Sequence, residues 1–115
     1  MQVQRIQNNN INFGIKISPE LIKEADNFYC KQNNSQEQFN RFYRKAKYMI
    51  EKYGFDDYTI FTKQNNRKGY ISTALYAIKD GENQEPILLS VKDSMRKILE
   101  KFIHINEYEL KNKLS

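Results

Sequence analysis

The chain is poor in cysteine, histidine and glycine and contains no tryptophan. Its 115 residues include one Cys, one His and four Gly. A single cysteine, Cys30, excludes an intrachain disulfide and is typical of proteins from a reducing compartment. One thiol and one imidazole cannot form a cluster of metal ligands, and the separated glycines do not make a phosphate-binding loop. We therefore expect neither a metal nor a cofactor.

Long hydrophobic runs are also absent. No apolar segment approaches the roughly 20 residues that a membrane-spanning helix needs. The polar start of the chain, MQVQRIQNNN, lacks the apolar segment of a secretory signal. These absences predict a cytoplasmic protein with no membrane partner.

Catalytic side chains are isolated along the sequence. Nucleophilic catalysis needs a nucleophile beside a base. Cys30 falls on the polar side of a predicted helix, and His104 lies at the flank of another. Asp56 and Asp57 are neighbours, which in an extended segment point to opposite faces. We expect a protein that is not an enzyme, with a small nuclease as the least favoured alternative.

The chain does contain enough apolar surface for one folded core. Hydrophobic residues make up 39% of the sequence, and fifteen residues are Phe or Tyr. A chain of this length fits one domain and can bury roughly two thirds of its unfolded surface. We predict a flexible, Asn-rich tail over residues 1–10 and a single α+β domain over residues 11–115.

The first half of the chain predicts one strand and two helices. Alternating apolar residues over INFGIKI, residues 11–17, indicate a half-buried strand. Ser18-Pro19-Glu20 is a helix start, and this helix should run to about Lys31. Ser35 opens a capping box for a second helix that ends before Gly54. The second helix has one apolar stripe, formed by Phe39, Phe42, Tyr43, Ala46, Met49, Ile50 and Tyr53.

The second half predicts three strands and a last helix. Residues 58–63, 70–78 and 87–91 are β-branched and aromatic, and the segments NNRKG and KDGEN separate them as turns. The last helix should start within residues 90–93 and bury Val91, with Asn106 either ending it or capping a further turn. The order β-α-α-β-β-β-α predicts a two-layer sandwich. A three- or four-stranded, mainly antiparallel sheet would carry the helices on one face, with the first strand at an edge.

Positive charge gathers in the second helix and beyond it. The net charge is +5, which favours polyanionic partners. Residues 41–101 hold 13 cations and 8 acids, whereas residues 18–40 hold two cations and four acids. Side chains suited to phosphates and exposed bases occur in two groups. The helix group is Arg41, Arg44, Lys45, Tyr48 and Lys52, and the turn group is Lys63, Arg67 and Lys68.

From the second helix onward, the order α-β-β-β-α resembles that of double-stranded RNA binding domains. The resemblance implies RNA contacts from the helix, the hairpin turn and the start of the last helix. Here the turn reads NNRKG and the start of the last helix reads VKDSMRK. With the first strand included, the order also resembles basic ribosome hibernation factors, which implies a ribosomal surface as partner. These likenesses concern the fold and carry function only by analogy.

The predicted strand YISTALYAI, residues 70–78, offers a different candidate surface. Both of its faces are substantially apolar, so helices on one face would leave Tyr70 and Tyr76 exposed on the other. Two hypotheses follow. The first is a non-enzymatic module that binds RNA or a ribosomal surface. The alternative is a small regulatory or inhibitor protein of bacterial or phage origin, which binds a protein partner or a second copy through these tyrosines.

Overall fold

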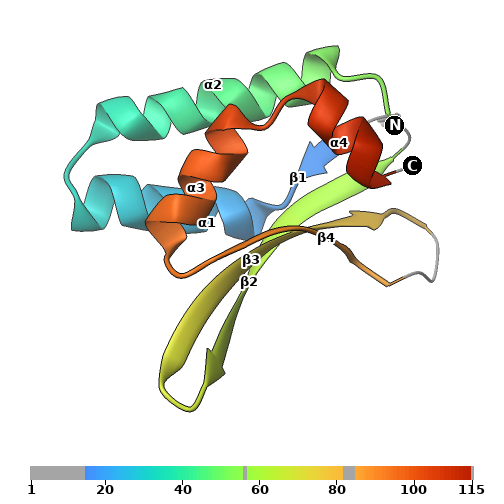
Figure 1. Cartoon of the computed structure of the whole chain (residues 1–115). Coiled ribbons are helices and arrows are strands. Elements are labelled where there is room, and N and C mark those ends of the chain that lie inside the picture. Colours follow the sequence, from blue (N-terminus) through green and yellow to red (C-terminus); the bar gives the residue numbers. More distant parts are fainter. Residues whose placement is uncertain (1–14, 56, 82–84, 115) are drawn as a thin grey trace, which may run out of the picture.

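The computed structural model describes residues 15–55, 57–81 and 85–114. The elements follow the predicted order (Figure 1). They are β1 (Ile15–Ile17), α1 (Pro19–Asp26), the π-helix η1 (Asn27–Gln32), α2 (Gln36–Lys52), β2 (Tyr58–Arg67), β3 (Tyr70–Lys79), β4 (Ile87–Lys92), α3 (Met95–His104) and α4 (Glu107–Leu114). The predicted tail over residues 1–10 and the first part of the predicted strand, residues 11–14, lie outside the described residues.

The four strands form one sheet in the order β1-β2-β3-β4. β2, β3 and β4 make an antiparallel meander, and β1 pairs parallel to β2 at the edge, with Ile15 opposite Tyr58. A register shift between Leu75 and Tyr76 places one extra residue in β4. The prediction of a mainly antiparallel sheet with the first strand at its edge is therefore confirmed.

All the helices lie over one face of the sheet, as expected of helices with single apolar stripes (Figure 1). The core between the layers is built from fully buried side chains of both. The helices supply Leu21, Tyr29, Phe42, Met49, Ile98, Leu99, Phe102 and Leu110, and the sheet supplies Ile15, Ile60, Leu75 and Ala77. We call the sheet face toward the helices the inner face and the opposite one the outer face.

Helix ends follow the predicted capping chemistry in most places. The Ser18 and Ser35 side chains accept hydrogen bonds from the backbone N–H groups of Leu21 and Gln38. Asn106 caps a separate helix, since its Oδ1 accepts from the Glu109 N–H at 2.8 Å. The last predicted helix is therefore two helices, and the recapping alternative is the correct one.

The predicted start of the last helix is wrong. Val91 belongs to β4 and is 50% exposed, and α3 begins only at Met95, after the N-cap Ser94. A serine N-cap fixes this boundary because its side chain satisfies the free N–H of Lys97. The α2 stripe is also narrower than expected, since Tyr43 and Ile50 at its margins are 44% and 48% exposed.

The β2–β3 hairpin is longer than predicted. The segment NNRKG is not a five-residue turn, because residues 65–67 continue β2 and pair with residues 70–72 of β3. Only Lys68 and Gly69 form the turn, with φ values of 54° and 84°. Two positive φ angles define a type I′ turn, whose twist matches that of the flanking strands and lets the ladder continue to the end.

One carboxylate fastens β1 to the rest of the sheet. Asp80 accepts a hydrogen bond from Lys16 Nζ at 2.7 Å and another from the Thr59 hydroxyl at 2.6 Å. Burial raises the pKa of Asp80, but the hydrogen bonds from Lys16 and Thr59 and the charge of Lys16 outweigh it and hold this pKa below its ordinary value of 3.8.

We expect Asp80→Asn to lower the free energy of unfolding by about 1 kcal/mol at neutral pH, because it removes a paired and hydrogen-bonded charge. A lowered native pKa stabilises the fold above the unfolded pKa, and this contribution is lost as the pH falls through the native value. The difference between Asp80→Asn and wild type should therefore begin to shrink near pH 3.8 and vanish once the pH is below the lowered native pKa of Asp80. Urea unfolding at neutral pH and at a pH below the native pKa of Asp80 measures this difference in unfolding free energy. An equal difference at the two pH values would show that the Asp80 charge does not stabilise the fold.

Candidate nucleic-acid interface

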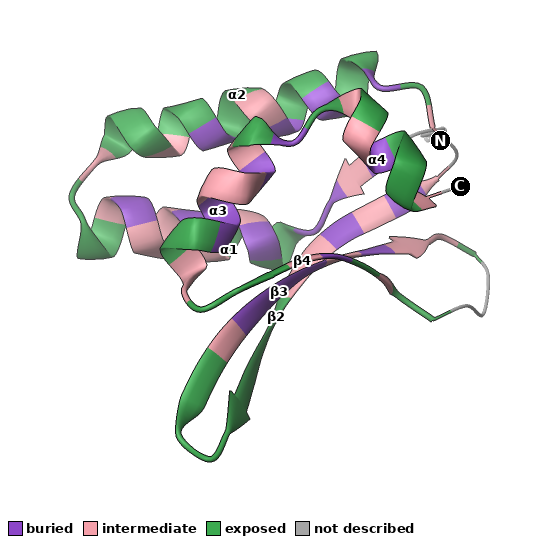
Figure 2. Ribbon diagram, viewed as in Figure 1, coloured by how far each residue is buried: buried purple, intermediate pink, exposed green. Residues whose placement is uncertain are grey.

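The far end of the β2–β3 hairpin extends past the helical layer. Figure 1 shows it projecting away from the helices, and Figure 2 shows that this end is exposed. Every residue from 63 to 71 is exposed, including Tyr70 at 82% and Ile71 at 54%. We call residues 63–71 the hairpin arm. A two-stranded ribbon held only at its base offers both faces to a partner.

The hairpin has positive charge and no acid. From Tyr58 to Lys79 the chain has no Asp or Glu across 22 residues, while it has the cations Lys63, Arg67, Lys68 and Lys79. Among the described residues, the three cations of the hairpin arm form no ion pair. Their charges are therefore available to an anionic ligand.

The arm also has a concave surface. A depression of about 660 Å³ is lined by Asn65, Asn66, Arg67, Lys68, Tyr70 and Ser72. Its lining combines amide and hydroxyl groups with two cations and an exposed ring. Such a combination can hydrogen-bond base edges, stack on a base and neutralise phosphates. The predicted turn segment NNRKG included Arg67, whereas Arg67 lies on β2 together with Lys63.

The helix group is not a uniform solvated surface. Arg41, Arg44 and Lys52 are exposed, as expected, whereas Lys45 is half-buried; Arg41 and Lys45 also make side-chain contacts. Arg41 Nη2 lies 3.3 Å from His104 Nε2 on α3. Lys45 is half-buried, and its Nζ donates a hydrogen bond to the Tyr53 hydroxyl at 3.2 Å. These two cations therefore take part in the packing of α2 against α3 and the segment after it.

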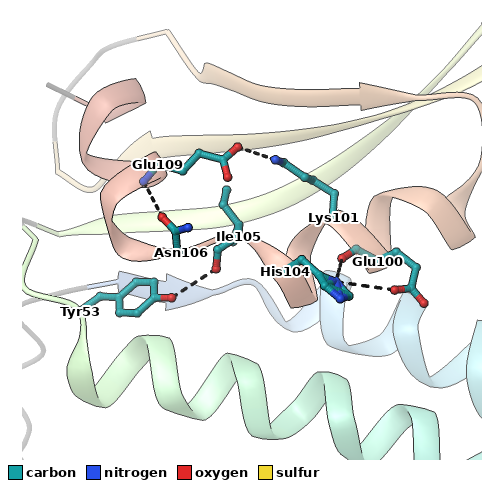
Figure 3. A network of polar contacts seen from close by, with 7 residues as sticks. All are labelled: Tyr53, Glu100, Lys101, His104, Ile105, Asn106 and Glu109. Atoms are coloured by element: carbon teal, nitrogen blue, oxygen red, sulfur yellow. Dashed lines mark hydrogen bonds and ion pairs between the residues drawn. The ribbon is translucent and has the colours of Figure 1, made fainter.

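Tyr53 joins α2 to the junction between α3 and α4 (Figure 3). Its buried hydroxyl donates to the Ile105 carbonyl at 3.2 Å while it accepts from Lys45. Burial lowers the pKa of Lys45, and burial raises the pKa of Tyr53, with Tyr48 and Glu107 adding to the latter effect. Tyr48 is 55% exposed, and its ring meets the Tyr53 ring edge-on at 5.9 Å.

Two cations of α3 are neutralised by ion pairs. Lys97 pairs with Asp93 at 3.1 Å, and Lys101 pairs with Glu109 on α4, as Figure 3 shows for the second pair. Paired charges contribute less to a positive field than free ones. The start of α3 is therefore a weaker candidate for phosphate contacts than the hairpin arm.

The two predicted groups do not form one surface. α2 lies in the helical layer, and the hairpin arm extends from the opposite side of the molecule (Figure 1). The helix group and the turn group are therefore separate candidate sites. Of the two, the hairpin arm contains no acid, whereas α2 also contains Glu37 and Glu51.

The tyrosines predicted to face a partner are on the outer face. Tyr76 is half-buried and stacks on Phe61 of β2, with ring centroids 5.5 Å apart and an interplanar angle of 21°. Tyr70 lies at the end of the arm, beside Arg67 in the ladder. The sequence analysis missed Phe61. Thr59, Phe61 and Lys63 are spaced two residues apart along β2, so this spacing already predicted that they share one face of the sheet.

The side chains considered for catalysis lie apart from one another. The His104 nitrogens lie within 3.3 Å of Arg41 Nη2 and within 3.1 Å of the Glu100 carbonyl, so both are engaged in helix contacts. Partial burial raises the pKa of the Cys30 thiol, and the hydrogen bond and charge of Asp26 raise it further, which disfavours a thiolate. Asp56 lies outside the described residues. Within the described ranges, no group of His, Cys, Asp and Glu side chains is arranged to hold a metal ion.

We expect Tyr53→Phe to lower the free energy of unfolding by about 1 to 2 kcal/mol. The change keeps the ring but leaves the buried Ile105 carbonyl and the half-buried Lys45 amine without this hydroxyl. Urea unfolding followed by circular dichroism measures the loss. Tyr48→Phe is the matched control, because it removes an exposed hydroxyl and should change stability by less than about 0.5 kcal/mol. Equal losses in both variants would show that the Tyr53 hydroxyl does not stabilise the junction.

Comparisons with protein-family models, with curated proteins and with solved structures find no match for this chain. In the described part of the chain, no helix has the length and apolar character needed to cross a membrane. Any functional conclusion therefore depends on the arrangement of the residues themselves.

Proposed function

We propose that this protein is a small, non-enzymatic RNA-binding module that holds the RNA backbone at the hairpin arm. The observation that carries the proposal is the unpaired positive charge of Lys63, Arg67 and Lys68 on a projecting, acid-free hairpin. Phosphate contacts by unpaired cations supply most of the sequence-independent affinity for nucleic acids.

The shape of the arm supports the same proposal. Because residues 63–71 are exposed throughout, the cations can approach phosphates without displacing any other element. The type I′ turn keeps the two strands in register to their ends, so the cations have fixed positions relative to one another. Fixed charges lose less conformational entropy on binding than flexible ones.

A cytoplasmic location is part of this proposal, because cellular RNA with which the arm would interact is found there. The single cysteine, Cys30, is compatible with such a reducing compartment. Binding to a ribosomal surface would be one form of the same interaction, since ribosomal RNA presents the same phosphate backbone.

A protein partner is the second candidate function. The observation that favours it is the exposure of two large apolar side chains, Tyr70 and Ile71, at the end of the arm. Exposed aromatic residues beside arginine are enriched at interface hot spots. The two candidates differ in salt dependence, because a protein contact through these side chains would survive moderate salt, whereas phosphate contacts would not.

We expect the triple variant Lys63→Gln, Arg67→Gln, Lys68→Gln to bind a mixed-sequence 20-nucleotide RNA about 100-fold more weakly than wild type in ~0.1 M salt. Each cation that no longer neutralises a phosphate should reduce the slope of log affinity against log salt by about 0.7 to 0.9, so that slope should fall by about 2 to 3. Fluorescence anisotropy of a labelled RNA over a salt series measures both quantities.

The matched control is Arg44→Gln, Lys47→Gln, Lys52→Gln on α2, which removes the same charge from exposed positions. Its salt slope should stay close to that of wild type, apart from the small effect of net charge. If this control weakened binding as much as the arm variant, the arm would not be the RNA site. If wild type bound no RNA at low salt, the proposed function would be wrong.

A further inference from the structure

None of the helices in the described ranges lies on the outer face of the sheet (Figure 1). The helices all cover the inner face, where Thr73, Leu75 and Ala77 of β3 are fully buried (Figure 1). On the outer face, Leu88 and Val91 of β4 are 49% and 50% exposed. This face is continuous with the outer side of the hairpin arm, because the β2–β3 ladder runs unbroken to Arg67 and Tyr70.

Aromatic rings line the middle and the end of this face. Phe61 and Tyr76 pair across β2 and β3 and stack on each other, so they form one apolar surface. Tyr70 lies further along the same side of β3, since it is separated from Tyr76 by an even number of residues. It is 82% exposed, and no ring of another described residue stacks on it.

Cations and polar groups alternate with these rings on the outer face. Lys63, Asn65 and Arg67 of β2 follow Phe61 at intervals of two residues, and Ser72 lies between Tyr70 and Tyr76 on β3. At the opposite end of the face, Lys16 neutralises the carboxylate of Asp80 at 2.7 Å. Along its two central strands the face therefore combines the exposed Tyr70 ring and the half-buried Phe61 and Tyr76 rings with positive charge and no acid.

We propose that this outer face binds single-stranded nucleic acid, with bases stacked on the Phe61–Tyr76 pair and on Tyr70 and phosphates held by Lys63 and Arg67. This inference rests on the proposed RNA-binding function and names the form of nucleic acid. Stacking on aromatic side chains requires bases whose faces are free, and duplex bases stack on each other instead. Alternating rings and cations on an exposed sheet provide both contacts along one strand.

Charge favours a polyanion over a second copy of this chain on the same face. In a twofold symmetric dimer the same patch meets itself, so Lys63 and Arg67 would approach the same cations of the partner. Like charges placed opposite each other across an interface disfavour association. Among the residues described on β2 and β3, no acid is present to offset this repulsion.

The first test compares a 12-nucleotide single strand of mixed sequence with its duplex, using wild type, Tyr70→Leu and Tyr76→Leu. We expect wild type to prefer the single strand, and each leucine variant to bind it about tenfold more weakly, since each removes one stacking ring. Affinity for the duplex should not change. Tyr70 is mostly exposed, so Tyr70→Leu leaves the fold intact even if Tyr76→Leu destabilises it.

Tyr108→Leu is the matched control, because Tyr108 is 75% exposed on α4, away from the outer face. Its affinity for the single strand should equal that of wild type. Equal binding of single strand and duplex, with no effect of Tyr70→Leu, would overturn the inference and leave the arm as a phosphate-binding site. Loss of all nucleic-acid binding would overturn the proposed function as well.

A second readout uses the absence of tryptophan from the chain. In Tyr70→Trp the new indole would be the only one, and a base stacked on it should quench its fluorescence. We expect quenching by the single strand and none in Tyr108→Trp. Sedimentation of the same samples without nucleic acid tests whether a second copy of this chain covers the outer face instead. A dimer that buries the Tyr70→Trp indole and excludes the single strand would also overturn the inference.

Discussion

The structure depends on the burial of all helices against one face of a small sheet. Each helix has a single apolar stripe, so it can satisfy that stripe only on a surface of the same character. The inner face supplies this surface with Ile60, Leu75 and Ala77, all of which are fully buried. Because no described helix is left to cover the outer face, the large side chains of Leu88 and Val91 there are about half exposed. The fold of the inner layer therefore determines which surface is open to a ligand.

A second constraint is the two-residue turn at the end of the hairpin. Left-handed backbone at Lys68 and Gly69 reverses the chain in the shortest way, so β2 and β3 pair along their full lengths. A five-residue turn over residues 65–69 would have ended the ladder several residues earlier and placed Arg67 on a loop. The regular ladder instead places Arg67 opposite Tyr70 and Lys63 opposite Ala74. The turn thus links local backbone conformation to the geometry of the proposed site.

Charge is divided between the layers in a way that follows from packing. In the helical layer, lysines meet acids of neighbouring turns and helices, as in the Lys97–Asp93 and Lys101–Glu109 pairs. Lys45 is drawn toward the Tyr53 hydroxyl and is half-buried. Within the part of the chain that the structure describes, the cations of the hairpin arm have no such neighbours, so their charges stay free. The net charge of the chain is therefore less informative than the absence of acids from one strand pair.

Periodicity and capping residues in the sequence determined the order of elements, the one-sided packing and the inner stripe of α2, because these depend on interactions within about one turn or one strand. Ser35 and Phe42 show this, since their roles follow from local spacing alone. The sequence also identified the cations and tyrosines, but it did not show that Arg41 contacts His104 and Lys45 contacts Tyr53. Only the tertiary structure decided that α2 and the hairpin lie on opposite sides and that Phe61 stacks on Tyr76. Those relations join residues distant in sequence, and long-range packing fixes them where local propensity cannot.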